Sequence, residues 1–280
     1  MKDLTAFCKN IQQAENGIWY APAHQPISYP DQGNECCFEV EASSFWFKHR
    51  NQCILSLVEK YSSPLGVPFF DIGGGNGYVS AALANKGYEI ILVEPGENGV
   101  QNAQKRGLEN LICSTFDAAG IKNEVMGSVG LFDVIEHIED DLSMLKALHP
   151  LISKNGKCYI SVPAFSFLWS EKDVFSGHFR RYTLKTLSNL LTEAGFKLRF
   201  GTYIFRFLPV PIFLLRSIPS KISKKLKKSI GGPTTSRTHV VQKKWKERLL
   251  QSFFSGEVTN IREGRAMRFG ASCLVVADKV

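Results

Sequence analysis

The sequence lacks the features that mark several classes of protein. Its seven cysteines include no CxxC pair and no histidine-rich partner spacing, so we expect neither a metal site nor a disulfide framework. Reduced thiols of this kind fit a cytosolic compartment. No apolar run reaches the roughly 18 residues that a membrane-spanning helix requires. The start of the chain also lacks the basic and apolar regions of a signal peptide, so we expect a cytoplasmic protein.

Acidic residues are scarce in one long stretch. Between Lys197 and Arg248 the chain has many Lys and Arg residues but a single acid, Glu247. The segment 203–219 is apolar, and a run of lysines with apolar residues at helical spacing follows it at 221–230. This pattern favours attachment to an anionic membrane surface. The alternative is a segment that packs on the core, followed by a solvated charged helix.

The most informative segment is Phe69-Phe70-Asp71-Ile72-Gly73-Gly74-Gly75-Asn76-Gly77. It predicts a buried strand, a glycine-rich turn in which some positions need positive φ, and a helix over 78–86 closed by Gly87. The next strand, 89–93, leads to Glu94, whose carboxylate can accept both ribose hydroxyls of a bound nucleoside. This βαβ unit predicts a site for an adenosine-containing cofactor.

The spacing of the glycines distinguishes between cofactors. A dinucleotide fingerprint reads G-x-G-x-x-G/A, but counting from Gly73 ends at Tyr78 and counting from Gly75 ends at Ser80. A nicotinamide dehydrogenase is therefore disfavoured. The observed D-x-G-x-G-x-G, from Asp71 to Gly77, resembles motif I of the class I S-adenosylmethionine (SAM) dependent methyltransferases.

The resemblance extends over about residues 66–205 and the strand 272–277. A predicted strand at 127–132, the segment D-V-I-E-H-I-E-D-D, a helix at 142–151 and a strand at 156–163 resemble ubiquinone-type and other small-molecule O-methyltransferases. The resemblance implies a Rossmann-like, doubly wound α/β sheet of seven strands, six parallel and the last antiparallel. With 44% apolar residues in 280, the chain can bury one large core. We therefore divide it into four parts: an N-terminal cap (1–62), a cofactor-binding core (63–204), an insertion between strands six and seven (205–268) and the final strand (269–280).

The family relationship also implies which residues bind SAM and release S-adenosylhomocysteine. The glycine turn and its leading acid would pass under the methionine part, Glu94 would bind the ribose, and Asp117 the adenine amino group, with Phe116 or Thr115 as alternatives. We expect Asp133 close to the methionine end of the cofactor, Arg50 at the carboxylate of the cofactor, and Phe132 as a further cofactor contact. The predicted cofactor residues are Asp71, Gly73, Gly75, Gly77, Glu94, Asp117, Phe132, Asp133 and Arg50.

Two histidines are candidates for the general base that removes a proton from an acceptor hydroxyl. His178 lies in the long loop after the fifth predicted strand, and His137 follows Glu136 beyond the fourth. Each has a structural alternative, loop ordering for the first and hydrogen bonding at a helix start for the second. The remaining acceptor-side candidates are the aromatic residues and arginines near these loops: Trp46, Phe165, Trp169, Arg180 and Arg181. The alternative for one of these arginines is an ion pair with a nearby acid such as Glu171 or Asp173.

The strand order predicts where the insertion lies. It leaves from the carboxyl edge of the parallel strands, where ligands of open α/β sheets bind, so we expect it to cover the mouth of the active site. An apolar cover suits a lipid-like acceptor or one presented from the inner face of a membrane.

The leading hypothesis is a methyltransferase acting on a small or lipid-like acceptor, at oxygen. Absence of a D/N-P-P-Y/F tetrapeptide after the fourth strand argues against amino-group methylation of bases or glutamine. The alternatives are an RNA methyltransferase that uses the basic insertion, although nucleic acid is the less favoured partner, and a non-catalytic membrane-associated protein that retains the fold. The sequence leaves the acceptor's identity and the oligomeric state open.

Overall fold

The computed structural model describes residues 2–21, 38, 40–62, 66–220 and 244–280. The predicted polybasic helix at 221–230 lies outside these residues. In the described part, one mixed sheet has the strand order β1-β2-β5-β4-β3-β6-β7-β9-β8. The strands are β1 (Gln12–Gln13), β2 (Trp19–Tyr20), β3 (Phe69–Ile72), β4 (Ile90–Glu94), β5 (Leu111–Cys113), β6 (Met126–Phe132), β7 (Ile152–Pro163), β8 (Phe196–Ile204) and β9 (Ser272–Lys279).

The sheet contains the predicted seven-stranded arrangement and two further strands. Strands β3 to β7 pair in parallel, and β9 pairs antiparallel with both β7 and β8, so β8 runs in the same direction as the other five. The prediction of seven strands was wrong in number, because the described part of the sheet has nine. The short hairpin β1–β2 extends the edge by pairing β2 in parallel with β5.

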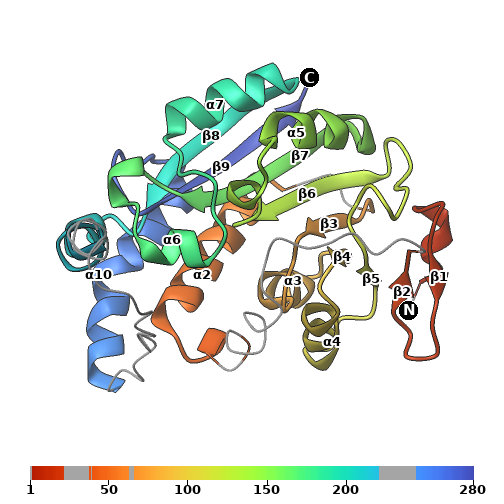
Figure 1. Ribbon diagram of the computed structural model, residues 1–280, viewed down its shortest axis with the longest axis horizontal. Coiled ribbons are helices and arrows are strands. Elements are labelled where there is room, and N and C mark those ends of the chain that lie inside the picture. Colours follow the sequence, from red (N-terminus) through yellow and green to blue (C-terminus); the bar gives the residue numbers. More distant parts are fainter. Residues whose placement is uncertain (1, 22–37, 39, 63–65, 221–243) are drawn as a thin grey trace, which may run out of the picture.

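Helices cover both faces of the sheet, as expected for a doubly wound fold (Figure 1). One face packs against α5 (Asp141–Leu148), α7 (Leu184–Glu193) and the N-terminal η1 (Leu4–Ala6). The other packs against α2 (Phe45–Lys60), α3 (Tyr78–Ala84) and α10 (Lys244–Glu263), with α4 (Glu97–Lys105) near β5. Helices α2 and α10 lie side by side, so a C-terminal helix supports the element that carries Trp46 and Arg50 (Figure 1).

Several boundaries differ from the sequence prediction. The helix expected over 142–151 is split into α5 and η3 (His149–Leu151), because Pro150 has no N–H to continue the α-helical pattern. Strand β7 begins at Ile152, earlier than the expected start at residue 156. Asn155 has a left-handed φ of 67°, and the register of β7 on β6 shifts here, so the strand continues through an irregularity. Thr183 caps α7, accepting a hydrogen bond from the N–H of Thr186.

The described start of the insertion folds at the carboxyl edge of the parallel strands. Helix α8 (Pro209–Ile212) continues into a π-helical turn, η5 (Phe213–Ser217), which packs near η4 (Ser166–Leu168) and α6 (Glu171–Phe175). A buried carboxylate holds this segment. Glu257 of α10 accepts hydrogen bonds from the N–H groups of Phe205 and Arg206, at 2.8 Å each, and contacts His49 Nε2 at 2.9 Å. None of the described helices combines the length and hydropathy of a membrane-spanning segment.

Candidate active site

The glycine-rich turn after β3 has the conformation that its sequence predicts. Gly73, Gly75 and Gly77 have φ values of 70°, 52° and 69°, a region that L side chains rarely adopt. A Cβ at Gly73 would lie 2.8 Å from Val134, and one at Gly77 would lie 2.7 Å from Leu108, so both positions are also closely packed. At Gly75 a Cβ would meet no atom within 4 Å. The turn therefore presents bare backbone to open space at this one position.

Glu94, at the end of β4, closes this space from the side. Its Oε2 accepts a hydrogen bond from Gly75 N at 2.9 Å, and its Oε1 accepts one from Gly96 N at 2.8 Å. The side chain is buried, and burial raises the pKa of Glu94 to about 7. A buried carboxylate beside a glycine turn can accept hydroxyl donors from a ligand.

Asp71, the acid that leads the motif, lies beneath the turn. Its Oδ2 accepts a hydrogen bond from Ser80 Oγ at 2.6 Å, whereas Oδ1 is buried without a hydrogen-bond partner among the described residues. Burial raises the pKa of Asp71 to about 6. This buried oxygen is therefore left with an unused acceptor beneath the turn.

A segment of the N-terminal cap lies over the other side of the turn. Glu41 is buried, pairs with Arg106 at 2.7 Å and accepts a hydrogen bond from Asn76 Nδ2 at 3.3 Å. The Arg106 guanidinium also lies 4.5 Å from the ring of Phe38 and donates to the carbonyl of Asn76. The sequence analysis missed this network, because neither Glu41 nor Arg106 belongs to a recognisable motif.

Asp133, directly after β6, connects the glycine turn to a second site. It has a φ of 60°, which is strained for a residue other than glycine, and its Oδ1 accepts a hydrogen bond from Ser161 Oγ at 3.0 Å. Its Oδ2 lies 2.9 Å from Nε of Arg50, which is almost buried on α2. Arg50 is therefore paired with Asp133, and a cofactor carboxylate would have to share it.

A pocket of about 260 Å³ opens beside Asp133 at the carboxyl edge of the sheet. Its walls come from α2, the ends of β6, β7 and β9, the loop with α6, and the start of the insertion. The lining residues are Trp46, Asp133, Glu136, Pro163, Ser170, Lys172, Asp173, Ser176, His178, Arg181, Ile212, Arg216, Ala271 and Ser272. Trp46 stacks on Phe205, with ring centroids 3.8 Å apart, which fixes the indole in this wall.

His178 forms a hydrogen-bonded pair with a buried acid in the pocket wall. Its Nδ1 lies 3.1 Å from Oδ1 of Asp173, which also forms two contacts with Arg181, at 2.7 and 3.1 Å. Hydrogen bonds from His178 and Arg181 hold the pKa of Asp173 well below its usual range, despite its burial. The ionised carboxylate of Asp173 favours the tautomer in which Nδ1–H of His178 donates to it, so that Nε2 carries the free lone pair.

His137 and Glu136 lie next to this pair. The rings of His137 and His178 are 4.7 Å apart, and burial together with His178 lowers the pKa of His137 to about 4. Glu136 is 1% exposed, and neither carboxylate oxygen has a hydrogen-bond partner among the described residues. Burial and the neighbouring Asp133 raise its pKa well above the usual value. Ligand atoms of Glu136, His137 and His178 lie within 4.8 Å of one another, a donor set that could hold a divalent cation.

A family model described as a methyltransferase domain matches residues 46–199, which include the glycine turn, Glu94, the strained Asp133 and the His178 loop. The chain belongs to the methyltransferase domain family. This confirms the resemblance to class I SAM-dependent methyltransferases drawn from Asp71–Gly77 and from the segments that follow it.

Curated relatives and solved structures agree with this assignment. A ubiquinone biosynthesis O-methyltransferase of Pseudomonas aeruginosa (strain LESB58) is 24% identical over 149 residues, which are 48% of this chain and 64% of the relative. A SAM-dependent methyltransferase of Thermotoga maritima has a TM-score of 0.50 at 18% identity, covering 84% of this chain and 93% of that one. A geranyl diphosphate methyltransferase in complex with GPP and sinefungin has a TM-score of 0.51 at 11% identity, covering 81% and 76%.

The site at the glycine turn fits SAM, the cofactor of the family. The open face of Gly75 leaves room for a ligand, and the buried Glu94 carboxylate can accept the ribose hydroxyls. The unsatisfied Oδ1 of Asp71 can accept a hydrogen bond from an ammonium group. Asp117, predicted to contact the adenine, is exposed in the turn after β5, and that contact stays a prediction.

The pocket beside Asp133 does not include every predicted acceptor-side residue. Trp46, His178 and Arg181 line it, but Phe165, Trp169 and Arg180 do not. Phe165 stacks on Tyr203, with centroids 4.9 Å apart, and the Arg180 guanidinium pairs with Asp141 at 2.9 Å. Phe132, predicted to contact the cofactor, has its ring stacked on Phe69 in the core, so only its backbone can face the cofactor.

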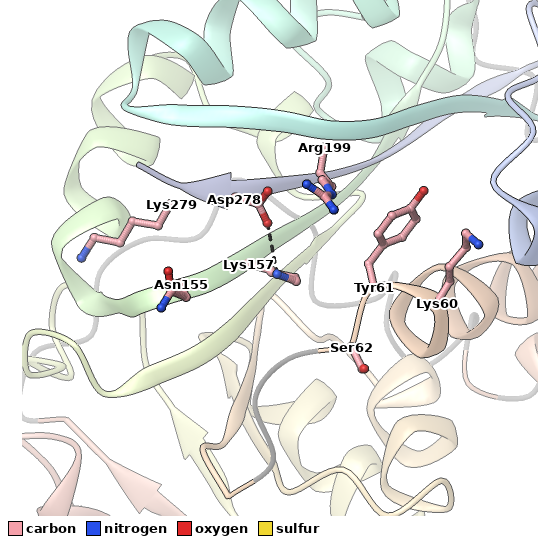
Figure 2. Close-up of a pocket in the computed structure, with 8 residues that line it drawn as sticks. All are labelled: Lys60, Tyr61, Ser62, Asn155, Lys157, Arg199, Asp278 and Lys279. Atoms are coloured by element: carbon pink, nitrogen blue, oxygen red, sulfur yellow. Dashed lines mark hydrogen bonds and ion pairs between the residues drawn. The ribbon is translucent and has the colours of Figure 1, made fainter.

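A second pocket, of about 440 Å³, lies at the opposite edge of the sheet (Figure 2). Its eight lining residues come from the end of α2 and from β7, β8 and β9, and the Lys157–Asp278 pair, 3.1 Å apart, crosses it. It is lined by none of the residues of the cofactor site or of the His178 pocket. The predicted site residues that line a pocket therefore lie at the carboxyl edge of the sheet.

Proposed function

We propose that this protein transfers a methyl group from SAM to a hydroxyl oxygen of a small, lipid-like acceptor. The observation that carries this proposal is the His178–Asp173 pair in the pocket beside Asp133. The pocket adjoins the glycine turn, because Val134, next to Asp133, contacts Gly73. A base and a cofactor cradle on neighbouring strand ends are the two parts that transfer to a hydroxyl requires.

The residues of the pocket act on the acceptor and its proton. SAM, when bound, supplies a methyl group already activated on a sulfonium. Nε2 of His178 would take the hydroxyl proton as the oxygen forms its bond to the methyl carbon and the carbon–sulfur bond breaks. Asp173 holds the ring through Nδ1 and stabilises the imidazolium that results, and Arg181 keeps Asp173 ionised. The wall formed by Trp46 on Phe205 restricts access of water.

The surface around the pocket supports a lipid-like acceptor. Large apolar side chains are exposed on elements that line the pocket or contact them, namely η4, α6, the His178 loop and the start of the insertion. Phe175 is 81% exposed and Leu215 is 75% exposed, and the others are Phe167, Val174, Phe179, Val210 and Leu214. An exposed apolar rim of this kind marks a binding surface. Together with the lysines at 221–228, it supports peripheral attachment to an anionic membrane at the cytoplasmic face.

The names of the curated relatives support oxygen as the acceptor atom, since they are ubiquinone biosynthesis O-methyltransferases. The chain spans 64% of the length of these relatives, so their acceptor is not transferred to this protein.

The test begins with calorimetric titration of S-adenosylhomocysteine, with NADH in parallel. We expect micromolar binding of the first and none of the second. Membrane lipid extracts would then be incubated with the protein and SAM labelled in the methyl group, and the labelled product analysed by mass spectrometry. A methyl ether would support the proposal, and a methyl ester or an N-methyl product would contradict it. Absence of cofactor binding would favour a non-catalytic protein.

The base is tested with two histidine variants. His178→Gln should lower the rate about 100-fold or more. His149→Gln, at a surface position near β8, is the matched control and should retain the wild-type rate.

A further inference from the structure

The charges in the wall of the His178 pocket do not cancel. Arg181 is compensated by Asp173, and Asp133 is compensated by Arg50. Glu136 compensates no cation of the wall, because neither of its carboxylate oxygens has a hydrogen-bond partner among the described residues. Two cations remain, Lys172 of α6 and Arg216 of η5.

Neither remaining cation has a partner in the described part of the chain. No hydrogen bond or ion pair within 4.0 Å joins Lys172 or Arg216 to an acid or a carbonyl there. The acid whose charge acts on Arg216 is Asp173, and that carboxylate already forms hydrogen bonds with Arg181. Both side chains therefore keep their donors free at the mouth of the pocket.

The two cations also repel each other. Partial burial and the positive charge of Arg216 lower the pKa of Lys172. Partial burial and the charge of Arg181 lower the pKa of Arg216. Bringing like charges together at a pocket mouth destabilises the unliganded protein, and an anion between them would offset this cost.

We propose that Lys172 and Arg216 form a subsite for a phosphate monoester carried by the methyl acceptor. Two uncompensated cations match the nearly two negative charges of such a group at neutral pH. Arg216 can bind two of its oxygens through a planar guanidinium, and Lys172 contributes a point charge. The subsite thus selects an acceptor that has an anionic head group. This proposal rests on the proposed function only in assigning the phosphate to the methyl acceptor.

The position of the subsite defines the rest of this ligand. Leu214 and Leu215 directly precede Arg216, and Val174 and Phe175 follow Lys172 on α6, all four exposed. An acceptor with its phosphate between the two cations would therefore have apolar surface beside it, and its hydroxyl would face His178 within the same pocket.

Calorimetry with simple probes tests the subsite without knowledge of the acceptor. Octyl phosphate, octanoate and inorganic phosphate would each be titrated into protein saturated with S-adenosylhomocysteine. We expect octyl phosphate to bind most tightly, octanoate more weakly because it has a single charge, and inorganic phosphate more weakly because it has no apolar chain. Equal binding of octanoate and octyl phosphate would overturn the assignment to a phosphate.

The variants Lys172→Gln and Arg216→Gln, singly and combined, locate the binding. We expect about a tenfold loss of octyl phosphate affinity for each, corresponding to one charge-assisted hydrogen bond or more. Arg206→Gln is the matched control, because Arg206 is an exposed arginine of the same segment whose guanidinium lies 4.4 Å from the ring of Phe207 and which does not line the pocket.

An unchanged affinity in the double variant, or an equal loss in Arg206→Gln, would overturn the proposal. Affinity for S-adenosylhomocysteine should be the same in all variants, which separates loss of the subsite from loss of the fold. Octyl phosphate would also be titrated into the protein alone. If it bound while S-adenosylhomocysteine did not, the proposed function would be contradicted and the anion subsite would be supported.

Discussion

The carboxylate of Asp173 accepts a hydrogen bond from Nδ1 of His178, 3.1 Å away, although Asp173 is only 1% exposed. The same carboxylate caps the N-terminus of α6 by accepting a hydrogen bond from Ser170 N at 2.8 Å. One buried charge therefore orders the loop, orients the candidate base and neutralises Arg181. The stability of the loop and the chemistry proposed for it depend on one residue.

Asp173→Asn should destabilise the protein strongly, because the amide cannot neutralise Arg181. Removing one partner of a buried ion pair costs about 3–5 kcal/mol, so we expect a large fall in the midpoint of thermal unfolding. Asp140→Asn makes the same chemical change at the exposed N-cap of α5, where Asn caps equally well, and should change stability little. Equal melting temperatures for the two variants would show that Asp173 is not the buried anion described here.

The same pair predicts an acid-sensitive loop. Since the folded-state pKa of Asp173 is depressed, its contribution to stability is complete above its unfolded pKa of about 4 and is lost as the pH falls below that value. Thermal unfolding of the wild type from neutral to acidic pH should show this loss. Asp173→Asn should show a smaller change over the same range.

Gly75→Ala should weaken cofactor binding more than it weakens the fold. A Cβ at this position meets no protein atom, so the side chain would occupy the space left for the ligand. Gly87→Ala is the matched control, with a φ of 88° and equally open surroundings away from the site. Both should cost about 1 kcal/mol of stability through backbone strain. Only Gly75→Ala should lose affinity for S-adenosylhomocysteine in calorimetry, and comparable losses in both would contradict this account.

Glu94→Gln should reduce the affinity for S-adenosylhomocysteine about 10- to 100-fold, because hydrogen bonds to a charged acceptor contribute about 1.5–3 kcal/mol. Glu97→Gln removes an acid three residues away, in the first turn of α4, where Glu97 accepts a hydrogen bond from Gln101. We expect this control to bind like the wild type. Retention of full affinity by Glu94→Gln would exclude a ribose contact.

Cofactor affinity should rise with pH. Ligand donors favour the ionised forms of Asp71 and Glu94, whose pKa values in the free protein are about 6 and about 7. Binding should therefore release protons and strengthen as the pH rises through this range, then level off. The stability of the unliganded fold changes with pH in the opposite direction. Because the folded-state pKa values of Asp71 and Glu94 are raised, their contribution to stability is complete below their unfolded pKa values and is lost as the pH rises through 6 and 7.

Calorimetry in buffers of different ionisation enthalpy would count the released protons. Glu94→Gln should release fewer protons than the wild type. An affinity that does not change with pH would show that neither carboxylate is coupled to the ligand.

Local patterns were sufficient to predict the conformation of the glycine turn and the position of Glu94 beside it. The alternate glycines, the acid that leads them and the acid after the next strand all act through backbone within one βαβ unit, so spacing along the chain is nearly spacing in space. The acceptor half was predicted less well. Arg180 and Arg181 are adjacent in sequence, yet one pairs with Asp141 and the other with Asp173, because successive side chains of an extended segment point to opposite sides.

The sequence by itself determined the family, the parallel sheet and the glycine turn with Glu94 beside it, because these depend on residues close together in the chain. Only the tertiary structure decided which cations remain uncompensated, since Lys172 and Arg216 are far apart in sequence and become neighbours when the insertion returns to the carboxyl edge. The pairing of Glu41 with Arg106, and of His49 with Glu257, was decided in the same way. Long-range electrostatic pairing leaves no local pattern, because any acid on the surface could neutralise any base until the chain has folded.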